Sequence, residues 1–231
     1  MTTTNDCKDM VDLVTDCRSD IQDQTATSNS GTVSFKFSHV LTKVADIKVK
    51  PGQDLGNDIK IFVTGLKLNP GSDKLQNKAK YQFSDNSWAA LTPASYFSGD
   101  LDLTGFLNKA TASSWGYTTP SVDVSDKDNA TSLFSTGEAL YFIPVDNWNG
   151  TGTKGDLKLR ITCDVVTKVT DGSHTVSTTT EKEVDLSQST FKKGMEHTYT
   201  LTIKLNTINI TVDETIVAWT TATAENMDVE Q

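Results

Sequence analysis

The stretch DLKLRITCDVVTKV, residues 156–169, alternates between apolar and polar side chains. The two alternating sets are Leu157, Leu159, Ile161, Cys163 and Val165, and Lys158, Arg160, Thr162 and Asp164. Because successive side chains of a β-strand point to opposite faces of the sheet, this period of two predicts a strand. One buried face and one solvated face are typical of antiparallel sheets.

Similar patterns lie on both sides of this stretch. HTYTLTIKL, residues 197–205, alternates in the same way, and so does TVSFKF, residues 32–37, until the rhythm is lost after His39. An Asp-Gly pair at residues 171–172 predicts a hairpin turn directly after the first stretch. The continuously apolar stretches at residues 58–68 and 139–145 predict central strands that are covered on both faces.

The chain divides into two parts. Residues 1–31 are polar and acidic, and we expect them to be an extension or the remnant of a missing N-terminal domain. Residues 32–231 form the domain that carries the strand patterns. In its middle third the periodicity fades, which predicts short strands, long connections and a single helical turn near residues 103–110. Because no sustained helical period occurs, we expect an all-β antiparallel sandwich with long loops and short insertions in the middle third.

Charge and composition exclude several functions. The formal net charge is -9, and Arg18 and Arg160 are the two arginines among 21 basic residues. Nucleic-acid recognition relies on clustered positive charge and on Arg, so we expect no nucleic-acid partner. No stretch approaches the roughly 20 apolar residues of a transmembrane helix. The first 30 residues lack the pattern of a signal peptide, so the chain is either cytoplasmic or a mature or shortened form of an exported protein.

Residues that could bind a metal or take part in catalysis are scattered along the chain. The three histidines His39, His174 and His197 show no metal-ligand spacing, and the acidic stretch at residues 123–132 lacks the glycine of a calcium-binding loop. No nucleophile elbow or phosphate-binding loop occurs, since the glycines near residue 150 lead into a strand. We therefore expect no enzyme activity, no catalytic residue, no metal site and no cofactor, and an enzyme is the least favoured interpretation.

Several segments, taken in order, resemble the Bacteroidetes fimbrillin family. VSFKFSHVLTKVADIKV (residues 33–49) resembles a family strand that contains Phe and His. IKIFVTGLKL (residues 59–68) and ALYFIPV (residues 139–145) resemble two further strands, the latter with an apolar-Ile-Pro ending. FKKGMEHTYTLTIKLNTINITVDETIVAW (residues 191–219) resembles the closing pattern, a Lys/Gly turn followed by two strands and a Trp.

This resemblance implies a fold and a function. Members of the family are Greek-key, transthyretin-like β-sandwiches that serve as structural subunits or accessory components of surface fimbriae, or pili, at the outer membrane. Their partners are other fimbrial subunits, in homo- or hetero-polymers assembled by β-strand addition. In the relatives, the donated strand is associated with the C-terminal segment. The candidate strand-donation or sheet-edge residues are therefore Ile208, Ile210, Val212, Ile216 and Trp219, which the domain's own sheet could equally contain.

Aromatic residues in the loops suggest an alternative function. Trp88, Trp115 and Tyr117 lie in loop-like surroundings and are candidate ligand-stacking aromatics. Exposed rings would stack on sugars, whereas buried rings would only fill the ends of a sandwich. The alternative to a fimbrial subunit is therefore an adhesin module that binds a host glycan or protein.

Overall fold

The computed structural model describes residues 10–16, 33–71, 75–112, 115–144, 157–168, 173–186, 191–205, 209–219 and 226–227. These residues form strands and a single short 3₁₀ helix, η2, in the order β1 (Val14–Thr15), β2 (Val33–Ser34), β3 (Ser38–His39), β4 (Thr42–Pro51), β5 (Ile59–Asn69), β6 (Gln76–Gln82), β7 (Ser87–Tyr96), β8 (Leu101–Asp102), η2 (Thr104–Phe106), β9 (Ala110–Ala112), β10 (Tyr117–Asp123), β11 (Thr131–Ser132), β12 (Leu140–Phe142), β13 (Lys158–Lys168), β14 (His174–Asp185), β15 (Met195–Lys204), β16 (Asn209–Ala218) and β17 (Asn226–Met227).

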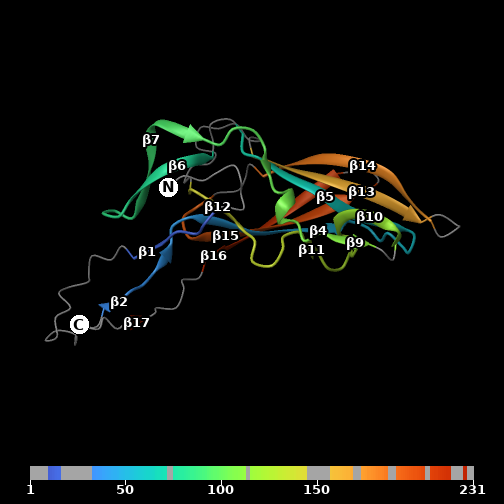
Figure 1. Cartoon of the computed structure of the whole chain (residues 1–231), viewed down its shortest axis with the longest axis horizontal. Coiled ribbons are helices and arrows are strands. Elements are labelled where there is room, and N and C mark those ends of the chain that lie inside the picture. The colour runs from blue at the N-terminus through green and yellow to red at the C-terminus, as the bar shows by residue number, and fades with distance from the viewer. Residues whose placement is uncertain are drawn as a thin grey trace.

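Two sheets pack face to face and form the body of the protein (Figure 1). One sheet has six strands in the order β14-β13-β5-β10-β9, with β8 paired to β5. The other has five strands in the order β11-β4-β15-β16, with β12 paired to β4. The prediction of an all-β sandwich is therefore confirmed.

A single apolar core fills the space between the sheets. Leu159, Ile161 and Cys163 of β13 face Tyr199 and other residues of β15, as the alternation of both stretches predicts. Each Å² of apolar surface that is removed from water stabilises the fold by about 25 cal/mol of free energy, and this burial holds the two sheets together. Asp164 departs from the predicted pattern, because it is buried although it belongs to the polar set of its strand.

The lost rhythm after His39 has a structural cause. The strand β4 pairs with β15, and this ladder skips one residue of β4 between Val44 and Asp46. The extra residue, Ala45, shifts the buried positions from 42 and 44 to 47, 49 and 51. A β-bulge therefore interrupts the alternation of β4, the longest strand of this region. The regular stretch that precedes it, residues 32–39, contributes only the short strands β2 and β3.

Two expectations about strand pairing need correction. The strands β4 and β15 run parallel, so the five-stranded sheet is mixed and not purely antiparallel. The stretch at residues 139–145 contributes β12, which pairs with one end of β4 at the border of the sheet and is not a central strand. Its predicted burial on both faces does hold, because Leu140 joins the main core and Ile143 joins a second cluster with Leu41. The predicted central strand at residues 58–68 is β5, which lies inside its sheet.

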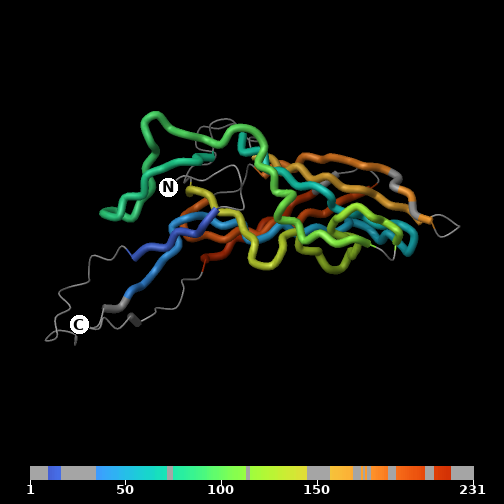
Figure 2. The backbone as a smooth tube through the Cα atoms, viewed as in Figure 1, coloured from blue at the N-terminus to red at the C-terminus, as the bar shows by residue number. Residues whose placement is uncertain are grey.

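Two small structures extend from one end of the sandwich. Figure 2 shows the hairpin of β6 and β7 standing off the two sheets, with the N-terminal segment close to it. That segment, residues 10–16, is bound to the body: Met10 is buried in the main core, and β1 pairs with β3 through Val14 and His39. The Leu13 carbonyl accepts a hydrogen bond from the Val40 amide at 3.1 Å.

Candidate functional site

The strand β16 forms the edge of the five-stranded sheet. It pairs with β15 in unbroken antiparallel register over ten residues, from Asn209 opposite Lys204 to Ala218 opposite Met195. No described strand pairs with its other edge. The N–H and C=O groups on such an edge can pair with a further strand.

Apolar side chains are exposed along this edge strand. Ile216 lies directly opposite His197, and opposite residues point to the same face, so Ile216 points to the inner side of the sheet. It nevertheless remains 43% exposed, and the next residue, Val217, is 49% exposed. Val212, also on the inner side, is partly buried against the main core. The sandwich is therefore incompletely covered at the Ile216 end of β16.

A buried hydrogen bond ties β16 to β15. The fully buried His197 places Nδ1 2.6 Å from Oε1 of Glu214. Because a carboxylate oxygen accepts, Nδ1 is the protonated ring nitrogen. The other nitrogen, Nε2, has no hydrogen-bond partner in the described part of the chain. Phe191 packs edge-on against the ring at 5.1 Å between centroids, so the imidazole sits in apolar surroundings.

Trp219 fixes the end of the edge strand. Its backbone N–H donates to the Gly194 carbonyl at 2.8 Å, and its ring stacks on His39 with centroids 3.5 Å apart. Tyr141 stacks on the same indole at 5.6 Å, and the Lys43 ammonium lies 5.1 Å from its centroid. The indole is thus a structural anchor.

His39 connects that anchor to the N-terminal segment. Its Nδ1 lies 2.7 Å from Oδ2 of Asp12, so one imidazole bonds to residues 10–16 and stacks on Trp219. These contacts give His39 a structural role at the junction of the two segments.

The remaining candidate edge residues are less fully described. Ile208 lies outside the described residues. Ile210 belongs to β16, where its backbone pairs with Ile203. The four described candidates thus fall on or directly after one strand, and that strand belongs to the domain's own sheet.

The three candidate stacking aromatics do not form one platform. Trp88 belongs to the β6–β7 hairpin, where its Nε1–H donates to the Val40 carbonyl at 2.7 Å. Trp115 packs beside Phe62 and Tyr117 on the six-stranded sheet, with the Lys60 ammonium 5.3 Å from its centroid.

Tyr117 is 5% exposed and stacks on Phe62 with centroids 4.5 Å apart. Its hydroxyl donates to the buried Asp164 carboxylate, which also accepts from Thr179 at 2.7 Å. Burial, together with the bond to Asp164, raises the pKa of Tyr117 to about 12. This hydroxyl therefore stabilises a buried carboxylate and is not available to a ligand.

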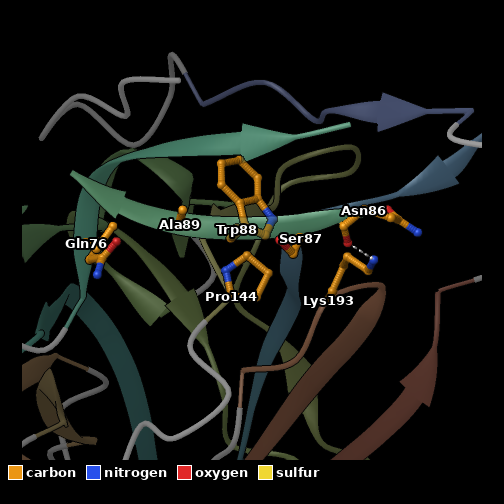
Figure 3. A pocket seen from close by; sticks show the side chains of 8 residues that line it. Gln76, Asn86, Ser87, Trp88, Ala89, Pro144 and Lys193 are labelled. Atoms are coloured by element: carbon orange, nitrogen blue, oxygen red, sulfur yellow. Dashed lines mark hydrogen bonds between the residues drawn. The ribbon is translucent and has the colours of Figure 1, made fainter. Parts of the chain in front are cut away.

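A cavity of about 320 Å³ lies between the β6–β7 hairpin and the body. Its walls come from three segments distant in the sequence: the hairpin, Pro144 and Lys193. The Lys193 ammonium donates to the Asn86 carbonyl at 2.7 Å and so links the hairpin to the body (Figure 3). In the same view the Trp88 ring lies on the opposite side of β7 from Pro144.

Other reactive groups have structural surroundings. Burial raises the pKa of the Cys163 thiol to about 12, which keeps it protonated and unreactive. The Asp126 carboxylate accepts from the side-chain amide of Asn129 and from the backbone N–H groups of Asn129 and Asp128, and these bonds hold its pKa below the usual value. Among the described residues, no three metal-ligating side chains gather at one place. Cys7 and Cys17 lie outside the described residues.

Sequence reasoning missed three residues of the edge site. Val217 occupies a position that the alternation assigns to the polar face, and its exposure became evident only from the edge position of β16. His197 and Glu214 lie 17 residues apart. Because they belong to consecutive strands joined by a short connection, a hairpin register would have been the signal for their contact.

Two packed sheets define the class of this protein, a β-sandwich, and among the described strands β15 alone pairs with its long edge strand β16. No protein-family model matches the chain. Fimbrium subunit Fim1C of Phocaeicola vulgatus is 60% identical over 230 residues, which make up 99% of this chain and 61% of that relative. The chain belongs to the fimbrillin family of fimbrial proteins.

A solved structure agrees with this assignment. The crystal structure of a fimbrial protein from Bacteroides vulgatus ATCC 8482 matches with a TM-score of 0.84 and 60% sequence identity. The match covers 95% of this chain and 66% of that chain. This chain therefore spans somewhat less than two thirds of the length of either relative. Within the described residues, no helix is long and apolar enough to cross a bilayer.

Proposed function

We propose that this chain forms the β-sandwich domain of a structural subunit of bacterial surface fimbriae. It acts by contact with other fimbrial subunits and not by catalysis, and its location is the cell surface, at an outer-membrane fimbrium. The 60% identity to a fimbrium subunit supports this role. We further propose residues 32–231 as the C-terminal domain of the subunit and residues 1–31 as an extension, of which residues 10–16 pack against that domain.

The single observation that carries the mechanism is the exposed edge of β16. A strand from a neighbouring subunit that pairs with this edge would satisfy its backbone groups and cover Ile216, which is 43% exposed. Head-to-tail contacts of this kind do not close on themselves, and they therefore produce a filament. In this proposal β16 is the accepting edge, because β15 already holds it in the domain's own sheet.

Charge substitutions on the edge test the proposal. The double variant Ile216→Lys, Val217→Lys in the full-length protein should abolish fimbriae, because lysines on an edge strand oppose pairing with another strand. The measurement is electron microscopy of fimbriae on the cell surface, together with the ladder of polymers on a denaturing gel. The matched control is Thr175→Lys on the exposed side of β14, which should leave assembly unchanged.

Folding is checked separately by thermal melts of the purified variants. The single variant Val217→Lys, whose side chain is on the outer face, should melt close to the parent and still assemble poorly. Normal fimbriae from a correctly folded double variant would refute strand addition at β16.

A further inference from the structure

The cavity beside β7 (Ser87–Tyr96) is built from two segments that the sequence singles out for other reasons. Pro144 ends the apolar-Ile-Pro element after β12, and Lys193 belongs to the Lys/Gly turn before β15. Both segments meet the β6–β7 hairpin at the cavity, whose volume is about 320 Å³. Ligand pockets begin at roughly 300 Å³, so the space suits a ligand the size of one sugar ring.

The turn that carries Lys193 is held rigidly. The Gly194 amide donates to the Leu41 carbonyl at 2.9 Å, and the Thr42 hydroxyl donates to the Lys192 carbonyl at 2.7 Å. Gly194 has a φ of +68°, and an added Cβ would lie 3.3 Å from the His39 carbonyl oxygen. A non-glycine residue would therefore be strained in this turn. The turn therefore fixes the backbone at Lys193, and the hydrogen bond to the Asn86 carbonyl places its ammonium at the cavity.

The hairpin wall is fixed as well. Trp88 donates its Nε1–H to Val40 and packs edge-to-face on Tyr81 with centroids 5.1 Å apart. Tyr81 in turn donates its hydroxyl to the Asn86 side-chain oxygen. The ring of Trp88 thus holds β7 against the body, on the side of the strand opposite to Pro144 (Figure 3).

The lining has a distinct chemistry. It combines the Gln76 amide, the Ser87 hydroxyl and the Lys193 ammonium with the small apolar surfaces of Ala89 and Pro144. None of the lining residues is acidic, although the Ser87 hydroxyl donates to the Asp85 carboxylate at 2.8 Å and so can only accept from a ligand. An ammonium group has three N–H donors, and Lys193 uses one of them for the Asn86 carbonyl. Amide and hydroxyl groups bind hydroxyls, while the remaining ammonium donors bind an anion.

We propose that this cavity binds a carboxylate-bearing monosaccharide unit, with Lys193 at the carboxylate and Gln76 and Ser87 at the hydroxyls. The site would give a fimbrial domain a contact with acidic polysaccharide. It does not depend on strand addition at β16, because none of the residues that line the cavity belongs to that strand.

The test is a titration of the purified chain with sodium glucuronate and, separately, with glucose. Binding is followed by ligand-observed NMR and by the indole N–H resonance of Trp88, assigned with Trp88→Phe. Glucuronate should bind saturably and about fivefold more tightly than glucose, as expected for a partly exposed ion pair. The preference should weaken at high salt, because salt screens exposed charges.

Three variants locate the binding. Lys193→Gln should lower glucuronate affinity to that of glucose, and Ala89→Leu should remove binding by filling the cavity. Lys78→Gln, on the exposed side of the same hairpin, should change neither. Absence of saturable glucuronate binding, equal affinity for glucose, or an unchanged Lys193→Gln variant would each overturn the proposal.

Discussion

The strands β14 and β16, the longest edge strands of the two main sheets, differ in what they expose. Glu181, Lys182 and Glu183 follow one another in β14, and Glu183 pairs with Lys158 at 2.9 Å and with Arg160 at 2.7 Å. The strand β16 instead exposes Ile216 and Val217. Charged residues are a common way in which proteins prevent an edge strand from pairing with other chains. The comparison teaches that β14 carries the charges that oppose further strand pairing, whereas β16 exposes apolar side chains, as the proposed strand addition requires.

The two edges also differ in how they are anchored. The β14 residue Thr179 donates to the buried Asp164 of β13, which also accepts from Tyr117, so two hydroxyl groups satisfy this carboxylate. At β16, Glu214 accepts from His197, whose Nε2 has no partner in the described part of the chain. The buried polar side chains that hold β14 are therefore more completely hydrogen-bonded than those that hold β16.

The largest effect is expected from the removal of Tyr117, which donates a hydrogen bond to the buried Asp164. Tyr117→Ala deletes a buried aromatic ring and one of the two donors to Asp164, so we expect a loss of about 4 kcal/mol in the free energy of unfolding. Chemical denaturation of the purified chain measures it. Tyr117→Phe is the control that keeps the ring, and it should cost only about 1–2 kcal/mol. Equal losses for both variants would show that the hydroxyl, and not the ring, dominates.

The pH dependence of stability reports on the same anchor. The pKa of Tyr117 is raised from 10.0 to about 12, so the folded state favours the neutral phenol. Its stabilisation is present in full below pH 10 and is lost as the pH rises to about 12. This loss is on the order of 2 kcal/mol. Thermal melts between pH 9 and pH 12, with Tyr117→Phe as the reference, measure it. The prediction fails if the two proteins lose stability in parallel.

The hydrogen bond between His197 and Glu214, which holds β16, should contribute somewhat less to the free energy of unfolding than Tyr117 does. Glu214→Ala leaves the buried Nδ1–H of His197 without its acceptor, which should cost roughly 2 kcal/mol. Hydrogen exchange should then accelerate along β16 and remain slow along β14. Glu214→Gln retains an acceptor and should behave more like the parent, while Asp213→Ala, an exposed neighbour, is the matched control. Unchanged exchange along β16 would contradict an anchoring role for this pair.

The smallest effect concerns the hydrogen bond that ties β14 to Asp164. Thr179→Val retains the shape of the side chain and removes one hydrogen bond to Asp164, so we expect a loss of about 1 kcal/mol. For a chain of this length that corresponds to roughly 2–4 °C in the melting temperature. Because Tyr117 still donates to Asp164, assembly should be unaffected. A loss as large as that of Tyr117→Ala would contradict the ranking.

Local pattern was sufficient to predict much of the fold. The alternation at residues 157–163 and 199–203 identified side chains that are buried in the core. The predicted hairpin is confirmed by the antiparallel pairing of β13 with β14, although its turn lies outside the described residues. These features can be predicted because they depend on residues that are close together in the sequence.

Features that depend on distant residues were not readable. The regular stretch at residues 33–38 is divided because β2 pairs with β17 whereas β3 pairs with β1, and no local pattern specifies such partners. Asp164 belongs to a polar set, yet Tyr117 covers it from a strand 47 residues away. The cavity at Lys193 likewise requires three segments to meet. The five candidate edge residues came from a resemblance to whole segments, which carries such long-range information indirectly.

The parallel pairing of β4 with β15 also has consequences for how the protein is made. Val49 lies opposite Leu201, a separation of 152 residues, so β4 is synthesised long before its partner β15. Folding rates fall as the sequence separation of contacts grows. A ribosome adds about 5–20 residues per second, so the five-stranded sheet cannot form during the first several seconds of synthesis. Throughout that interval β4 has no β15 to pair with, so the five-stranded sheet stays incomplete.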